Sequence, residues 1–129
     1  MRIPGLFFCI LFALACQEAD KTATPVKKDY IKKIPGNDEE IPIADIRRGE
    51  VLIAYSDCYE CHTRDHRSKG PAFRDIARRY PINSGYIKLL SLRVIQGGSG
   101  AWGNSVMLPH PQLSSEDAET MVKFILSLE

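Results

Sequence analysis

Residues 58–62 read Cys-Tyr-Glu-Cys-His, which is the C-x-x-C-H pattern of covalent c-type haem attachment. Two thiols at this spacing bridge one face of a porphyrin and add to its two vinyl groups as thioethers. The histidine that follows directly lies under the iron as its proximal ligand. The motif predicts one haem c, attached through Cys58 and Cys61 and ligated by His62.

The cysteine pair has three other interpretations. A structural zinc site needs a second pair of ligands at short spacing, and the remaining cysteines, Cys9 and Cys16, lie in or beside an export signal. A redox dithiol of the thioredoxin kind is expected in a βαβ context, and the sequence offers no convincing strand. A plain disulfide is compatible with an exported chain. Haem attachment is the favoured interpretation.

The N-terminus has the pattern of an export signal. Arg2 is followed by a nearly unbroken apolar run that ends in Ala-Leu-Ala at 13–15, a small-x-small cleavage site. The run is shorter than the roughly 20 residues that span a bilayer. We expect residues 1–15 to be a signal peptide, removed from a protein that works on the periplasmic or outer-surface side.

Cys16 follows this cleavage site directly, so the segment resembles a lipoprotein signal. It departs from the usual lipobox because Ala13 stands where leucine is more common. We expect a lipid on Cys16 that anchors the protein to a membrane; ordinary cleavage that leaves a free Cys16 is the alternative.

The rest of the chain divides into a linker and one small domain. Residues 16–43 are charged, carry several prolines and have few large apolar side chains, which indicates a flexible linker. Residues 44–129 are expected to form the domain. A core of this size is marginal, and a covalently fixed haem adds a large apolar plate to it.

Apolar spacing in this domain predicts an all-α fold of about four helices. The expected helices run over 45–56, from Pro71 to Pro81, from a Ser84 cap to Gly97, and from Ser114 onward. A loop rich in glycine and proline is expected over 97–113.

The second axial ligand of the iron has four candidates. Met121 lies on the apolar face of the last expected helix, where methionine usually packs in the core. His66 lies in a polar segment and is expected to face water. Met107 lies in the long loop, which can fold over the open face of the haem, and a thioether ligand raises the reduction potential. Met107 is the favoured ligand and His110 is its rival.

Four motifs in order resemble the short bacterial class I monohaem cytochromes c, of the cytochrome c551 and c552 kind. They are the motif at 58–62, Gly-Pro-Ala-Phe at 70–73, Gly-Ala-Trp-Gly at 100–103, and Met-x-Pro at 107–109. The similarity extends from about Gly49 to Leu128.

The resemblance implies the class I cytochrome c fold, with helices around one covalently bound haem and the first and last helices crossing near Gly49 and Ile53. It implies that the Pro71 carbonyl orients His62, and that Arg93 and the Trp102 indole contact the haem propionates. One position departs from the family: His110 stands where an asparagine often bonds near the axial methionine. If His110 takes over that role, the potential becomes pH-dependent, because histidine titrates near neutrality.

Charge indicates the class of partner. The chain is formally +1, but residues 58–93 contain eight basic and three acidic side chains. Such asymmetry steers association with an acidic redox protein, although a merely solvated surface explains it equally well. Near-neutral overall charge and the lack of a recognition motif argue against nucleic acid.

These observations predict an electron carrier rather than an enzyme, with no small-molecule substrate. Iron held by His62 and Met107 would carry single electrons between partners such as an oxidase, a reductase, a peroxidase or a periplasmic dehydrogenase. A haem-based gas sensor or haem enzyme, and the electron-transfer subunit of a larger dehydrogenase, are the alternatives.

Overall fold

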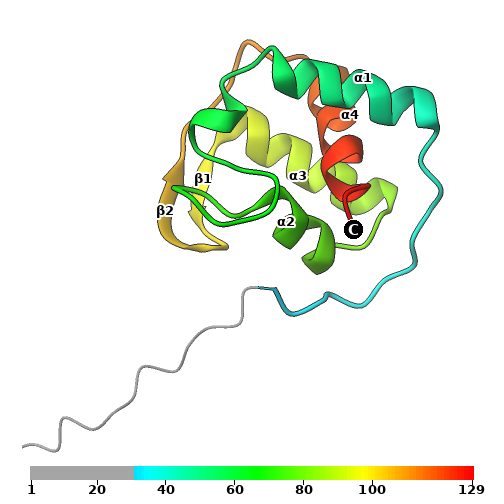
Figure 1. The fold of residues 1–129 in the computed structure, drawn as a ribbon, viewed down its shortest axis with the longest axis horizontal. Helices are drawn as coiled ribbons and strands as arrows, with labels where there is room; N and C mark the ends of the chain where they lie inside the picture. Colours follow the sequence, from blue (N-terminus) through cyan, green and yellow to red (C-terminus); the bar gives the residue numbers. More distant parts are fainter. Residues whose placement is uncertain (1–30) are drawn as a thin grey trace, which may run out of the picture.

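The computed structural model describes residues 31–129, which fold into four α-helices, one 3-10 turn and one β-hairpin (Figure 1). The elements in chain order are α1 (Ile43–Ala54), η1 (Cys58–Glu60), α2 (Phe73–Arg79), α3 (Ser84–Gln96), β1 (Gly98–Gly100), β2 (Gly103–Met107) and α4 (Ser115–Leu126). The predicted all-α fold of about four helices is confirmed in its helices, and the hairpin is an addition to it.

Helices α1 and α4, the first and last helices of this part of the chain, pack directly on each other. Gly49 and Ile53 are the buried residues of α1. A Cβ atom on Gly49 would overlap the Thr120 carbonyl oxygen and would lie 2.8 Å from the Phe124 Cβ. The crossing therefore requires a residue without a side chain at position 49.

The core consists of two clusters on either side of α4. One contains Ile53 of α1, Phe73 of α2 and Met121 of α4. The other contains Tyr80, Ile87, Val122 and Leu126, with Trp102 packed against it. Met121 is only 2% exposed, which confirms its assignment to core packing.

Side-chain caps fix the starts of α3 and α4. The Ser114 hydroxyl accepts a hydrogen bond from the Asp117 amide at 3.0 Å, as expected of an N-cap. For α3 the predicted cap was wrong by one residue: the Asn83 side chain caps the helix through the Tyr86 amide, and Ser84 is the first helical residue.

The expected loop over 97–113 contains a hairpin that the sequence did not predict. Strands β1 and β2 are antiparallel, with Gly98 opposite Met107 and Gly100 opposite Gly103. Glycines are depleted in strands, which is why this pairing escapes a propensity argument. Four glycines here adopt positive φ angles, namely Gly97, Gly98, Gly100 and Gly103, and the hairpin depends on that freedom.

Residues 33–42, which we call the strap, lie against the domain although they fall within the predicted linker. The Ile34 amide donates to the Arg79 carbonyl at 2.8 Å. The Ile82 amide donates to the Asp38 carboxylate at 2.7 Å, and Asp38 also pairs with Lys33. In Figure 1 the strap is the cyan segment that leads to the start of α1. The packed part of the chain thus begins before the expected boundary at residue 44.

The predicted signal peptide and Cys16 lie outside the described residues. Among residues 31–129, no helix combines the length and the apolar character that crossing a bilayer requires.

Candidate haem site

The cysteine motif forms a tight turn just after α1. The amides of Cys61 and His62 both donate to the Cys58 carbonyl, at 3.3 and 3.0 Å, and η1 closes the turn between the two cysteines. Both cysteines are free thiols rather than a disulfide. Cys58 is half-buried, and its sulfur lies 3.0 Å from the Ser56 hydroxyl. Burial raises the pKa of the Cys58 thiol, and the Ser56 hydrogen bond opposes that shift.

The imidazole of His62 is held in one orientation. Its Nδ1 lies 2.7 Å from the Pro71 carbonyl oxygen. A carbonyl only accepts, so Nδ1 carries the proton and Nε2 keeps its lone pair. Burial lowers the pKa of His62, the hydrogen bond to Pro71 raises it, and nearby His110 lowers it. The net shift is downward, and a neutral imidazole is the form that binds a metal.

Two residues of the segment 70–73 shape the space around this ring. Phe73 stacks on His62 with ring centroids 5.2 Å apart and planes at 17°. A Cβ on Gly70 would lie 2.6 Å from His62 Cε1, so only glycine leaves room for the ring. Both residues belong to the Gly-Pro-Ala-Phe motif at 70–73, whose contacts with His62 are not evident from the sequence.

Backbone hydrogen bonds close the loop that brings Pro71 to His62. The Gly70 amide donates to the Cys61 carbonyl at 2.8 Å, and the Phe73 amide donates to the Thr63 carbonyl at 2.9 Å. The start of α2 is therefore tied to the haem motif, which fixes the Pro71 carbonyl at the imidazole.

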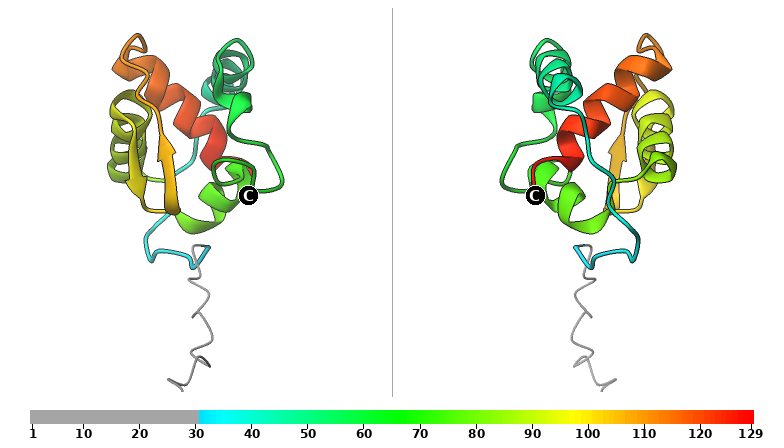
Figure 2. Two further views of the ribbon diagram at one scale, coloured as in Figure 1. Left: turned by 90° about the vertical axis from the view of Figure 1, so that its left-hand side faces the viewer. Right: turned by 90° about the vertical axis from the view of Figure 1, so that its right-hand side faces the viewer.

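Met107 is the last residue of β2 and is half-buried. Its carbonyl approaches Gly97 so closely that a Cβ there would lie 2.5 Å from the oxygen, and Gly97 has φ of 71°. In the left view of Figure 2, the hairpin (yellow to orange) and the segment after α1 (green) flank the end of α4 (red) from opposite sides. The hairpin, whose second strand ends at Met107, and the segment after α1 that contains the haem motif therefore lie on opposite sides of the end of α4.

The tip of the hairpin is held by two arginines that no sequence motif contains. Arg67 donates to the Trp102 carbonyl at 2.7 Å, and Arg79 donates to the Ala101 carbonyl at 3.2 Å. The Arg79 guanidinium also lies 5.0 Å from the centre of the Trp102 ring. Arg93, in contrast, is exposed on the last turn of α3 and lies beside Gly98.

The two remaining histidines differ in environment. His66 is exposed, in agreement with the expectation that it faces water. His110 is largely buried, with 14% of its side chain exposed, and it lies 3.2 Å from the Asp57 carboxylate. Asp57 directly precedes Cys58, and no sequence pattern pointed to it.

This donor set fits a covalently attached haem. Two free thiols on one turn are available for the two thioethers, and the neutral His62 presents Nε2 for the iron. Among residues 31–129, no group of three His, Cys, Asp or Glu side chains is arranged to hold a metal ion, so the zinc interpretation gains no support from this part of the chain.

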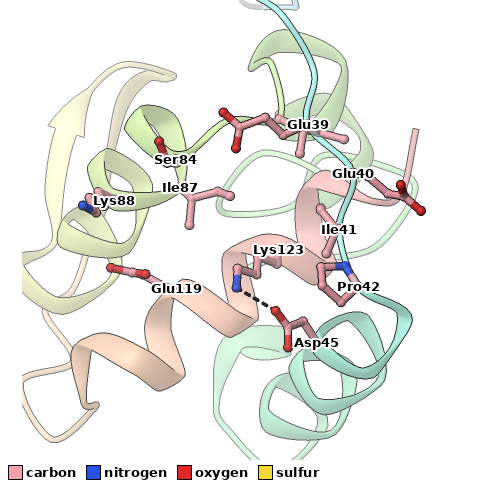
Figure 3. A pocket seen from close by; sticks show the side chains of 11 residues that line it. Glu39, Glu40, Ile41, Pro42, Asp45, Ser84, Ile87, Lys88, Glu119 and Lys123 are labelled. Atoms are coloured by element: carbon pink, nitrogen blue, oxygen red, sulfur yellow. Dashed lines mark hydrogen bonds and ion pairs between the residues drawn. The ribbon is translucent and has the colours of Figure 1, made fainter.

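A separate pocket of about 300 Å³ lies between the strap, α3 and α4 (Figure 3). Its lining includes Glu39, Ile41, Ile87 and Glu119, and the Asp45–Lys123 ion pair of 2.7 Å lies at its edge. No residue of the haem motif lines this pocket, so it is distinct from the candidate site.

Comparisons with known proteins also indicate a haem protein of the cytochrome c kind. Residues 46–129 match the family model for cytochrome c. Cytochrome c-551 of Azotobacter vinelandii is 33% identical over 79 residues, which cover 61% of this chain and 95% of that protein. Cytochrome c-552 of Hydrogenobacter thermophilus is 31% identical over 80 residues, which cover 62% of this chain and 81% of that protein.

A solved structure of a cytochrome c also matches this chain in its fold. The crystal structure of wild-type Nitrosomonas europaea cytochrome c552 aligns with a TM-score of 0.58 at 31% identity, over 62% of this chain and 99% of that chain. Fold, motif and family match agree: the chain belongs to the cytochrome c family, has the class I cytochrome c fold, and is a small monohaem electron carrier with one covalently bound haem c.

Proposed function

We propose that His62 and Met107 are the two axial ligands of the haem iron, and that Cys58 and Cys61 form the thioethers. The observation that carries the proposal is the oriented, neutral His62, whose Nδ1–H is held by the Pro71 carbonyl. Met107 is half-buried and ends the hairpin, which lies across the end of α4 from the haem-motif segment (Figure 2); this arrangement supports Met107 as the ligand of the other haem face.

The bound haem supplies a one-electron ferric–ferrous couple, and the protein residues adjust and protect it. Pro71 raises the electron-donating strength of His62 by accepting its Nδ1 proton in a hydrogen bond. Phe73 keeps water away from the ring by stacking on it. A thioether in place of a second imidazole favours the ferrous state. With His62 and Met107 as its ligands, the iron would have no open position for a substrate, and the haem would supply electron transfer alone.

Trp102 and Arg93 are proposed to contact the haem propionates, on the basis of the family resemblance. Arg67 and Arg79 support the position of Trp102 by donating to the carbonyls of the hairpin tip. Their charges would also offset the negative charge of the propionates.

The protein is proposed to work outside the cytoplasm, because its N-terminal pattern is that of an export signal. A lipid on Cys16 would anchor it to a membrane. Its partners are proposed to be other redox proteins, among them an oxidase, a reductase, a peroxidase or a dehydrogenase. The excess of basic residues over 58–93 favours partners with an acidic surface.

The test is the visible spectrum of the purified holoprotein in the oxidised form, in the reduced form, and after carbon monoxide is added to the reduced form. We expect a sharp reduced α-band, a weak far-red ferric band from methionine–iron ligation, and no response to carbon monoxide. Met107→Ala is expected to lose the far-red band and to bind carbon monoxide stoichiometrically, because its sixth position is open.

Met121→Leu is the matched control, since it removes a buried methionine from the core rather than from the hairpin. It is expected to keep the parent spectrum. If the unmodified protein readily binds carbon monoxide, Met107 is not a firm ligand and a gas-sensing role replaces simple electron carriage. If Met107→Ala keeps the far-red band, another residue ligates the iron.

A further inference from the structure

The strap binds to one short part of the domain, the connection between α2 and α3. The Ile34 amide donates to the Arg79 carbonyl at 2.8 Å, and the Glu39 amide donates to the Ile82 carbonyl at 2.6 Å. In the other direction, the Ile82 amide donates to the Asp38 carboxylate at 2.7 Å. The strap is thus held largely by hydrogen bonds to the main chain of one partner segment, as a docked peptide is.

The docked strap has one defined position. Gly36 lies so close to Pro81 that a Cβ atom on the glycine would be 2.6 Å from the Pro81 Cγ and 2.9 Å from its Cβ. The Asn83 side chain, which caps α3, also donates to the Asn37 carbonyl at 3.4 Å. Any larger residue at position 36 would therefore push the strap off this surface.

The strap nevertheless buries little of its own surface. Ile34 and Ile41 are half-buried, and its other residues are exposed. Lys33 pairs with Asp38 at 3.7 Å and with Glu129 at 3.8 Å, and all three side chains are about half exposed. Such ion pairs are weak and are screened by salt. Segments with few buried contacts open at the lowest free energy, so the strap can detach while the core stays folded.

The domain keeps its first helix when the strap leaves. α1 begins at Ile43, directly after the strap, and has no side-chain cap at the extended Pro42. The first turn of α1 is held independently, because Asp45 pairs with Lys123 of α4 at 2.7 Å. The match to the cytochrome c family also begins only at residue 46. Pro42 is therefore a suitable hinge between the strap and the folded domain.

Detachment would move the point at which the upstream chain joins the domain. In the docked form this point lies at the end of α2, and in the detached form it lies at the start of α1 (Figure 1). The freed strap adds up to about 35 Å of extended chain. Within residues 31–129, no hydrogen bond or ion pair of the strap involves the haem motif, so the haem site stays the same in both forms.

We propose that the strap is a releasable section of the tether. When docked, it holds the domain near its anchor. When detached, it lengthens the reach of the haem toward redox proteins farther from the membrane. The inference rests on the proposed function in requiring the lipid anchor on Cys16.

Hydrogen exchange of the ferrous holoprotein, followed by NMR, tests whether the strap detaches as a unit. The amides of Ile34, Glu39 and Ile82 each take part in a strap contact. They are expected to share one opening constant, at least about tenfold larger than that of the α4 amides. Raising the salt from about 0.05 to about 0.5 M should increase it by up to about fivefold. Rates equal to those of α4, or three unrelated opening constants, would overturn the inference.

Two variants set the strap open or closed. Gly36→Val is expected to raise the opening constant more than tenfold, because its side chain would overlap Pro81. Gly36→Cys combined with Pro81→Cys is expected to lock the strap when oxidised, since the two Cβ positions, 2.9 Å apart, lie near the roughly 3.8 Å of a disulfide. Glu40→Ala, at an exposed strap position, is the control and should match the unmodified protein.

Reach is measured with the full lipidated chain on phospholipid vesicles that carry a headgroup fluorophore, which the haem quenches by energy transfer over short distances. The locked variant is expected to quench at least about twofold more strongly than Gly36→Val, because the detached strap adds up to about 35 Å. Reducing the disulfide should remove the excess quenching. Equal quenching by the two variants would overturn the inference. Failure of every variant to associate with vesicles would contradict the lipid anchor instead, while the exchange rates still decide whether the strap detaches.

Discussion

At the scale of single residues, the site depends on small groups as much as on ligands. Gly70 leaves room for the His62 ring, and Pro71 supplies the carbonyl that orients it. A side chain at position 70 would meet the imidazole before it met anything else. The lack of a side chain at position 70 therefore helps to fix the orientation of the His62 imidazole.

Gly70→Ala is expected to push His62 off its hydrogen bond with Pro71. The potential should rise, because an imidazole that loses this bond donates less electron density to ferric iron. Stability should fall by about 1–3 kcal/mol through overpacking. Redox titration and urea denaturation measure the two effects. Gly85→Ala, at an exposed helical position, is the control, and an unchanged potential in Gly70→Ala would contradict the role given to Gly70.

Sequence alone identified the residues whose chemistry is tied to a spacing, namely Cys58, Cys61 and His62, together with the candidate ligand Met107. It did not identify Asp57 or Arg79, and it placed Phe73 in a motif without giving it a role. The roles of these residues come from contacts across loops, to His110, Trp102 and His62 respectively. Acidic and basic residues occur throughout the chain, so no local pattern distinguishes Asp57 or Arg79.

At the scale of elements, the four helices were predictable because each carries an apolar stripe at helical spacing and has a proline, a glycine or a capping residue next to at least one of its ends. The hairpin was not predictable, since its pairing depends on glycines with positive φ angles and not on β-forming side chains. The strap was missed for a related reason: its proline-rich, charged composition indicates a linker, while its order comes from backbone hydrogen bonds to Arg79 and Ile82.

The crossing of α1 and α4 gives a prediction at this scale. Gly49→Ala would force the helices apart, because the new methyl group would overlap Thr120 and crowd Phe124. Unfolding free energy should fall by about 1–3 kcal/mol, against a change of less than about 1 kcal/mol for Gly85→Ala on α3. Urea denaturation followed by circular dichroism measures both. Equal unfolding free energies for the two variants would show that the α1–α4 contact accepts the added methyl group without loss of stability.

At the scale of the whole molecule, the strap joins distant parts of the surface. It connects the end of α2 to the start of α1, and Lys33 lies 3.8 Å from a carboxylate oxygen of Glu129. Any tether attached upstream therefore meets the domain at the end of α2 rather than at α1.

Asp38→Ala is expected to loosen the strap, because it removes the acceptor of the Ile82 amide and the partner of Lys33. Tryptic cleavage after Lys33 should become roughly tenfold faster, which corresponds to about 1.4 kcal/mol and is typical of a lost hydrogen bond to a charged group. Glu40→Ala, at an exposed neighbouring position, is the control. Equal cleavage rates for the two variants would mean that Asp38 does not hold the strap.

The contact between α1 and α4 also dictates an order of assembly. Chains emerge from synthesis N-terminus first, so the α1 segment is made before the helix that covers its buried face. Until α4 arrives, the crossing at Gly49 cannot form, and the cysteine turn just after α1 belongs to an open chain. The two thiols are therefore accessible in an open chain before the α1–α4 contact closes.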